Sequence, residues 1–265
     1  MALPREHFES LLRARQLDRT LTTAIPAADT RDESTLAPSS LDVLDARLGG
    51  GFPRGQLSEI VGARSSGRAS LMLRMLAAAT ARGELTALVD VVDMLDVESA
   101  SAAGIDLSRL LWIRGHVVVH PGPCRDLNQR ALEQAIRALT LVLQAGNFGL
   151  VVFDVGEAPA DAIRRLPFTT WLRLQRMVEG SQTTCVLVGG EAMARSSAGL
   201  TLKLTQELTQ KLTHELAQKL TQKVAPRGIR FGHGWFDGID VEARIVRARA
   251  REREDVRVSV STTCA

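Results

Sequence analysis

Apolar residues along this chain occur in two kinds of stretch, short runs in which they predominate and longer runs with helical spacing. The short runs are typical of strands buried on both faces of a parallel sheet. They lie at 57–61, 85–92, 110–114, 150–154 and 184–189. We expect helices between them, at 40–48, 68–82, 126–145 and 159–180. This alternation predicts an α/β fold with a mostly parallel sheet that helices cover on both faces.

The residues before this core have a different texture. Residues 1–22 place apolar side chains at helical spacing among charged ones, which predicts an N-terminal amphipathic helix. Residues 23–38 are polar, contain Pro26 and Pro38, and are typical of a linker. We therefore expect the core to span residues 39–203.

Residues 204–225 repeat a leucine at every fourth position and predict an inserted helix. A step of four advances about 40° beyond one helical turn, so these leucines spiral around the helix and form no single stripe. Glutamate and lysine at i,i+4 spacing support the helix. Two interpretations remain, a repeat expansion on the surface and a docking helix for a partner or a second copy.

Residues 226–265 form a predicted C-terminal β segment. Apolar and polar residues alternate over 241–249 and again over 256–260, which indicates antiparallel strands with one face buried. Arginines occupy the other face of the first strand. They could meet phosphates, but neighbouring acidic residues also fit an ordinary solvated face.

Composition narrows the function classes. Aromatic residues make up 4% of the 265 residues and tyrosine is absent, which argues against base stacking on an aromatic platform. The net charge of +3 permits an anionic partner without requiring one. The three cysteines show no CxxC spacing, so we expect neither a metal site nor a disulfide framework. No signal peptide or membrane-spanning run is apparent, and we expect a cytoplasmic protein without membrane partners.

The segment GARSSGRAS, residues 62–70, lies between a predicted strand and a predicted helix. This is the context of a phosphate-binding loop, G-x-x-x-x-G-K-[ST], whose backbone N–H groups and helix N-terminus attract phosphate. Arg68 replaces the lysine of the motif, and Ala69 replaces the hydroxyl that binds Mg²⁺. Asp154 ends an apolar strand in the manner of a Walker B carboxylate, although many strands end in a polar residue. The candidate residues of this degenerate nucleotide site are Gly62, Ser65, Ser66, Gly67, Arg68, Ser70 and Asp154.

The stretch PSSLDVLDARLGGGFPRGQLSEIVGARSSGRASLMLRMLAAA, with LTALVDVVDMLDVESASAAGIDLSRLLWI after it, resembles the core of bacterial RecA recombinases. The resemblance covers roughly residues 38–190 and implies a RecA-like P-loop fold. In active recombinases a glutamate that activates water follows the next strand, and Val92 stands at the matching position. The polar sensor residue of active recombinases would fall near Gly190, which has no side chain to take that role. The resemblance therefore implies no catalytic residue, no metal, and ATP or ADP bound weakly at most.

The shortened core, the degenerate loop and LPFTTWLRLQRMVEGSQTTCVLVGGEAMARSSAGLTLKL together resemble the ImuA family. These RecA-like accessory proteins belong to the bacterial cassette for damage-induced mutagenesis. The resemblance implies a non-catalytic role in the SOS response and translesion synthesis, in the cytoplasm at the nucleoid. The implied partners are ImuB, a catalytically inactive relative of Y-family polymerases, RecA itself and, indirectly, an error-prone DnaE-type polymerase.

The same resemblance suggests where DNA and protein partners bind. The segments after residues 154 and 189 correspond to the two DNA-contacting loops of recombinases but are shorter. Arg164, Arg165 and Arg195 lie in or near them and are candidates for phosphate contacts, or for solubility alone. Recombinases assemble head to tail through an N-terminal helix, which makes Phe8, Leu11 and Leu12 candidate partner contacts.

Three alternative functions stay open at this point. A weak DNA-dependent ATPase would use Arg68, Ser70 and Asp154. A cell-division inhibitor similar to SulA, another RecA-like remnant, would bind FtsZ. A non-specific DNA binder would lose affinity steeply with salt.

Overall fold

The computed structural model describes residues 35–206, 229–231, 236–248 and 257–263. All of them belong to the second of two compact units of the chain, Glu33–Ala265. The predicted N-terminal helix, with Phe8, Leu11 and Leu12, lies outside the described residues, as does the leucine repeat from residue 207 onward.

One nine-stranded sheet organises the described residues, in the order β11-β10-β8-β3-β7-β6-β4-β5, with β9 paired to β10. The run from β8 to β5 is parallel throughout, and β10 and β11 are antiparallel. Both features confirm the predicted fold class. The strands are β3 (Leu57–Gly62), β4 (Thr86–Asp90), β5 (Leu110–Arg114), β6 (Leu150–Asp154), β7 (Thr184–Gly189), β8 (Leu200–Gln206), β9 (Ile229–Phe231), β10 (Phe236–Ala248) and β11 (Arg257–Thr263).

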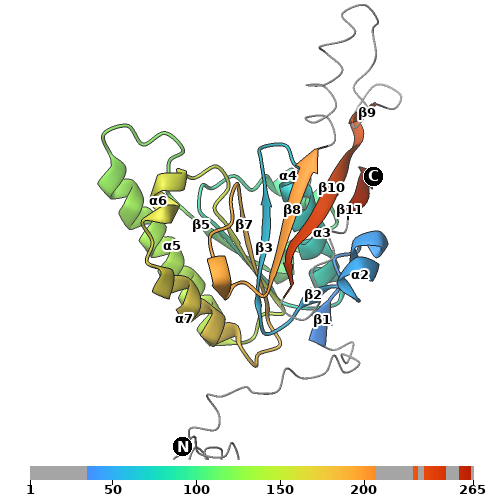
Figure 1. The fold of residues 1–265 in the computed structure, drawn as a ribbon, viewed down its shortest axis with the longest axis horizontal. Helices are drawn as coiled ribbons and strands as arrows, with labels where there is room; N and C mark the ends of the chain where they lie inside the picture. Colours follow the sequence, from blue (N-terminus) through green and yellow to red (C-terminus); the bar gives the residue numbers. More distant parts are fainter. Residues whose placement is uncertain (1–34, 207–228, 232–235, 249–256, 264–265) are drawn as a thin grey trace, which may run out of the picture. The chain divides into compact units, whose positions relative to one another are not determined.

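Helices cover both faces of the parallel strands, and Figure 1 shows α5, α6 and α7 on one face with α2 and α3 on the other. Each face has its own buried cluster, one around Leu139, Phe153 and Trp171 and one around Leu76 and Ile60. Because β3, β4, β6 and β7 are buried on both faces, apolar residues predominate in them, although β3 also carries the buried polar residues Ser58 and Glu59. The helices are α2 (Asp42–Leu48), α3 (Arg68–Ala81), α4 (Val97–Ala102), α5 (Arg125–Ala145), α6 (Ala160–Arg164) and α7 (Phe168–Val178), with 3-10 turns at Leu107–Arg109 and Arg195–Ser197.

The helix predicted over 159–180 is wrong as a single element, because it is divided into α6 and α7 at Pro167. Proline has no N–H to donate to the preceding turn, and it disfavours helical geometry at the residue before it. Pro167 instead serves as the N-cap of α7, with φ −58° and ψ 140°.

The helix predicted from residue 204 is also wrong at its start, since residues 204–206 complete β8. The alternation of Leu200, Leu202 and Leu204 fits a strand as well as a helix, and all three side chains are buried. Parallel pairing with β3, in which Leu204 lies opposite Gly62, decides the outcome. Tertiary pairing therefore overrides the local period at the end of the core.

The segment predicted as a linker ends in structure. Leu36–Ala37 form a short strand, β1, that pairs with β2 (Phe52–Pro53), and all four residues are buried. Gly51 makes this pairing possible: its φ is 136°, and a side chain there would lie 2.6 Å from the carbonyl carbon of Ala37. The expected linker thus includes residues that pack on the core.

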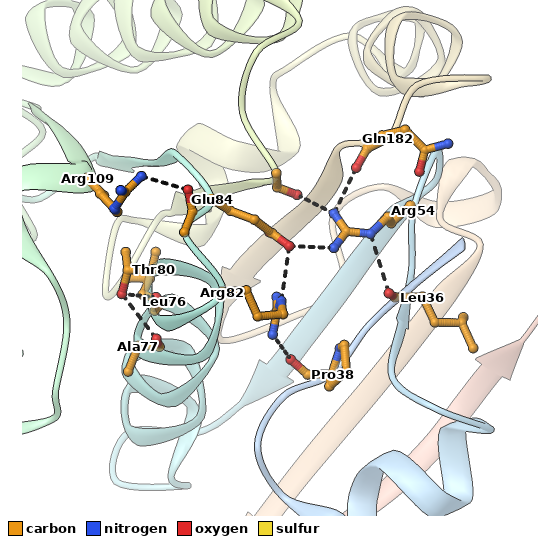
Figure 2. A network of polar contacts seen from close by, with 12 residues as sticks. Leu36, Pro38, Arg54, Leu76, Ala77, Thr80, Arg82, Glu84, Arg109 and Gln182 are labelled. Carbon is orange, nitrogen blue, oxygen red and sulfur yellow. Dashed lines mark hydrogen bonds and ion pairs between the residues drawn. The ribbon is translucent and has the colours of Figure 1, made fainter. Parts of the chain in front are cut away.

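Turns at the amino ends of the parallel strands are joined by Arg54. Its guanidinium donates to the carbonyls of Leu36 (3.4 Å), Gly149 (3.3 Å) and Gln182 (2.9 Å), and to Glu84 Oε1 at 2.7 Å. Figure 2 shows these groups converging on Arg54. One side chain therefore links β1, the loop before β4, and the loops that precede β6 and β7.

Glu84 holds a second arginine at the same end. Arg82 donates to Glu84 Oε1 at 3.0 Å and to the carbonyl of Pro38 at 3.2 Å. Burial alone would raise the pKa of Glu84, but hydrogen bonds from Arg82 and Arg54 outweigh it, so the pKa lies below its ordinary value. The ionised carboxylate is thus part of the folded state.

Candidate functional site

The opposite, carboxyl end of the parallel strands gathers most of the predicted nucleotide site. The phosphate loop follows β3, and Asp154 ends β6. The register places Asp90, at the end of β4, directly opposite Asp154. It also places Val61 opposite Gly189, so that Gly190 follows at the same edge. The topology therefore brings together residues that are about 20 to about 130 positions apart in the chain, as in other parallel α/β sites.

The phosphate loop keeps its backbone form. Ser65 and Gly67 adopt positive φ, 61° and 88°, and Ser66 N donates to the Ala63 carbonyl at 3.1 Å. A side chain on Gly62 would overlap Ser66 Oγ, which is buried and has no hydrogen-bond partner among the described residues. Helix α3 then begins at Arg68, and no side chain caps it. This is a compact turn that ends at a helix N-terminus, as predicted.

Arg68 differs most from the role that its position suggests. Its guanidinium is turned back under the loop: Nη1 donates to the Gly62 carbonyl at 2.6 Å, and Nη2 donates to the Gly156 carbonyl at 3.2 Å. Nη2 also forms an ion pair with Glu157, in the segment after β6. Arg68 as a whole is only 8% exposed. Acceptors of the chain itself therefore bind both Nη atoms of Arg68.

The acidic part of the site carries two carboxylates, the buried Asp90 and the partly buried Asp154. Burial raises the pKa of Asp154 to about 6, Gly156 N donates to its Oδ1 at 2.8 Å, and nearby Asp90 adds repulsion. Asp90 accepts from Leu95 N (2.7 Å) and from Trp112 Nε1 (3.3 Å). Sequence reasoning overlooked Asp90 because the strand was predicted to continue to residue 92, whereas β4 ends at Asp90.

The positions expected to prime water are apolar or without a side chain. Val92 is partly buried and packs against the core cluster that contains Phe153. A side chain added to Gly156 would lie 3.4 Å from Val92 Cγ2, so Val92 is next to the segment that follows Asp154. Gly190 lies near Arg68 instead of offering a polar group, because an added Cβ would be 3.7 Å from Arg68 Nη1.

These residues do not fit magnesium nucleotide. Ala69 has no oxygen to offer Mg²⁺, and Ser70 is one position further along α3. The residues that the structure describes contain no group of three or more His, Cys, Asp or Glu side chains placed to share a metal ion. The retained Asp154 therefore has one neighbouring carboxylate, Asp90, which is already hydrogen-bonded to Leu95 N and Trp112 Nε1.

Two of the three predicted DNA contacts line a cavity of about 470 Å³ between the segments that follow β6 and β7. Arg164 and Arg195 line it, and Arg164 pairs with Glu191 at 2.6 Å. Arg165 lies at a separate cavity of about 260 Å³ and is 3.5 Å from Asp161. Two of the three arginines therefore have acidic neighbours, and both of these pairs are exposed.

Glu59 holds the segment that follows β7, which lines one wall of the 470 Å³ cavity. This fully buried carboxylate on β3 accepts from the backbone N–H groups of Met193 and Ala194, both at 2.7 Å, and from Thr201 Oγ1 at 2.9 Å. Hydrogen bonds of this kind offset the desolvation of a buried charge. Sequence reasoning gave no sign of this role, because all three donors lie more than 130 residues away along the chain.

Among the described helices, none is both long and apolar enough to cross a membrane.

Comparison with known proteins agrees with this geometry. The RecA N-terminal domain matches residues 22–158. Protein RecA of Clavibacter michiganensis subsp. michiganensis is 35% identical over 128 residues, which are 48% of this chain and 32% of that protein. Protein RecA of Frankia alni is 34% identical over 127 residues (48% and 33%), and that of Acholeplasma laidlawii 34% over 118 (44% and 31%). The matches thus span about a third of the length of these relatives. Since the domain match covers more than half of the residues, this chain belongs to the RecA N-terminal domain family.

Proposed function

We propose that this protein is a non-catalytic RecA-like accessory factor of the bacterial DNA damage response that acts in translesion synthesis. Membership of the RecA N-terminal domain family supports the DNA-repair context. The resemblance to the ImuA family supports the narrower role. Its proposed partners are an ImuB-type inactive polymerase relative and RecA, with an error-prone DnaE-type polymerase reached indirectly.

The state of Arg68 is the observation that carries this proposal. Phosphoryl transfer needs a free cation, a metal and a positioned nucleophile at the phosphate loop. Here Arg68 is held by Gly62, Gly156 and Glu157, and Ala69 and Val92 supply no polar group. Loss of one such group could be compensated, but here the lysine, the metal-binding hydroxyl and the water-activating carboxylate are all replaced, and Asp154 alone is retained.

Protein contacts explain the charge pattern better than DNA contacts do. Arg164 and Arg165 face Glu191 and Asp161, so this surface carries little net positive charge toward a phosphate backbone. DNA is therefore a secondary partner in this proposal, contacted through Arg195 and its neighbours. Phe8, Leu11 and Leu12 remain the proposed partner contacts.

The role can be tested in a bacterium that carries the gene. Deleting the gene should lower damage-induced mutation, and a copy with Asp154→Asn should restore it, because no hydrolysis is needed. A copy in which Phe8, Leu11 and Leu12 are all replaced by serine should fail to restore mutation and should bind ImuB and RecA more weakly. Loss of function with Asp154→Asn, together with normal partner binding, would favour the weak ATPase instead.

A further inference from the structure

Arg68 and Glu157 connect two parts of the molecule that a bound nucleotide would otherwise connect. We propose that this ion pair is a built-in substitute for a phosphate, and that it locks residues 156–166 to the phosphate loop without any ligand. The proposal concerns the conformation of this segment and does not depend on which partner the protein binds.

The geometry of Arg68 supports a fixed contact. The guanidinium contacts the Gly62 carbonyl on one side and Glu157 and the Gly156 carbonyl on the other, so both ends of its planar fork are used. The Arg68 side chain is 10% exposed, whereas that of Glu157 is 45% exposed. A buried arginine loses much when the carboxylate that pairs with it directly is removed.

The carboxylate of Glu157 supplies what a phosphate would supply. It is an anionic group with two oxygens, and it binds the guanidinium of the residue at the motif's lysine position. A phosphate and Glu157 would therefore compete for the same guanidinium. A substitution of Glu157 that frees Arg68 should therefore also release the segment after β6.

The locked segment forms one wall of the 470 Å³ cavity. Gly156, Glu157 and Ile163 line this wall, and the opposite wall includes Met193, which Glu59 holds. One wall is thus tied to the buried Arg68 and the other to the buried Glu59. We infer that the cavity keeps one shape whether or not nucleotide is present.

Hydrogen–deuterium exchange of the full chain tests this lock. Glu157→Gln keeps the size and polarity of the side chain, so it should leave the fold intact while weakening the contact with Arg68. Exchange of the amides in 156–166 should become about tenfold faster. A hydrogen bond to a charged group typically lowers the opening of such a segment by that factor or more. Amides of β6 should not change.

A matched control lies on the same cavity. Glu191→Gln removes the exposed ion pair with Arg164, and it should change exchange of 156–166 by less than about twofold, since exposed pairs contribute little. Arg68→Lys should give an intermediate rate, because an ammonium cannot reach all three acceptors at once. Adding magnesium ATP to the wild-type chain should change nothing.

Two results would overturn the proposal. One is an exchange rate in Glu157→Gln equal to that of the wild type. The other is slower exchange of 156–166 in the wild type when magnesium ATP is added, because nucleotide would then supply a link that the ion pair does not. Neither result would bear on the partners of the protein, which the mutation assay tests separately.

Discussion

An arginine binds carbonyls and a glutamate of the chain itself at both ends of the parallel sheet. This is expected at the amino end but not at the carboxyl end, which carries the phosphate loop. At the amino end, Arg54 binds three turn carbonyls and Glu84. At the carboxyl end, Arg68 binds two loop carbonyls and Glu157. In a working ATPase the cation at the second position must stay available to phosphate. Here the arginine at the carboxyl end of the strands is bound by the chain itself, as is the arginine at the amino end.

The ends differ in how deeply the partner carboxylate is buried. Glu84 is 19% exposed and is shared by two arginines, whereas Glu157 is 45% exposed and has Arg68 as its cation. Burial makes an unpaired charge more costly. The comparison therefore predicts that the amino end contributes more to stability and that the carboxyl end is easier to open.

Replacing Arg54 should have the largest effect. Arg54→Ala leaves Glu84 with one arginine and leaves three carbonyls without this donor, and we expect a loss of about 3 kcal/mol in the free energy of unfolding. Urea denaturation measures it. Arg82→Ala is the control and should cost about 1 kcal/mol, because that side chain is more exposed. Equal losses would contradict the central role of Arg54.

Replacing Arg68 should have a smaller effect. Arg68→Ala removes the contacts with Gly62, Gly156 and Glu157, and we expect a loss of about 2 kcal/mol because Glu157 can turn toward water. The same urea titration compares it with Arg54→Ala. If the loss at Arg68 were the greater of the two, the proposed ranking of the two ends would be wrong.

Removing the charge of Asp154 should stabilise the protein at neutral pH. The ordinary pKa of an unfolded aspartate is about 3.9, whereas Asp154 in the fold has a pKa of about 6. The folded state therefore holds a proton that the unfolded state has lost, and the stability of the wild type falls as pH rises from about 4 to about 6.

Asp154→Asn removes this dependence and can still accept from Gly156 N. We expect it to be more stable than the wild type by about 2 kcal/mol near pH 7.5, and equal to it near pH 3.5. Thermal unfolding at both values measures the difference. Asp161→Asn, at an exposed carboxylate, should differ little from the wild type. A mutant that is less stable at pH 7.5 would contradict the role assigned to burial.

Much of the core could be predicted from the sequence because β4, β6 and β7 are short, mostly apolar runs that end at glycine or aspartate. The runs 150–154 and 184–189 are strands with those same bounds. The alternation in 241–249 also gave an antiparallel strand, although β10 begins earlier, at Phe236. Local pattern is sufficient where burial on both faces dictates the residue type.

The contacts that define the site could not be read in the same way. Glu157 lies 89 residues from Arg68, and the neighbouring positions of Asp90 and Asp154 follow only from the strand register. The start of the leucine repeat was misread because a leucine every second residue changes there to one every fourth. Sequence showed which groups were missing from the phosphate site, and only the fold shows what Arg68 binds instead.

The central claim is that the phosphate loop keeps its backbone but no longer supports hydrolysis. Phosphate release by the purified full-length chain, with ATP, Mg²⁺ and single-stranded DNA, tests it most directly. We predict a rate that is indistinguishable from that of Asp154→Asn and is unaffected by chelating the metal. Sustained turnover that requires Mg²⁺ and is abolished by Asp154→Asn would contradict the account.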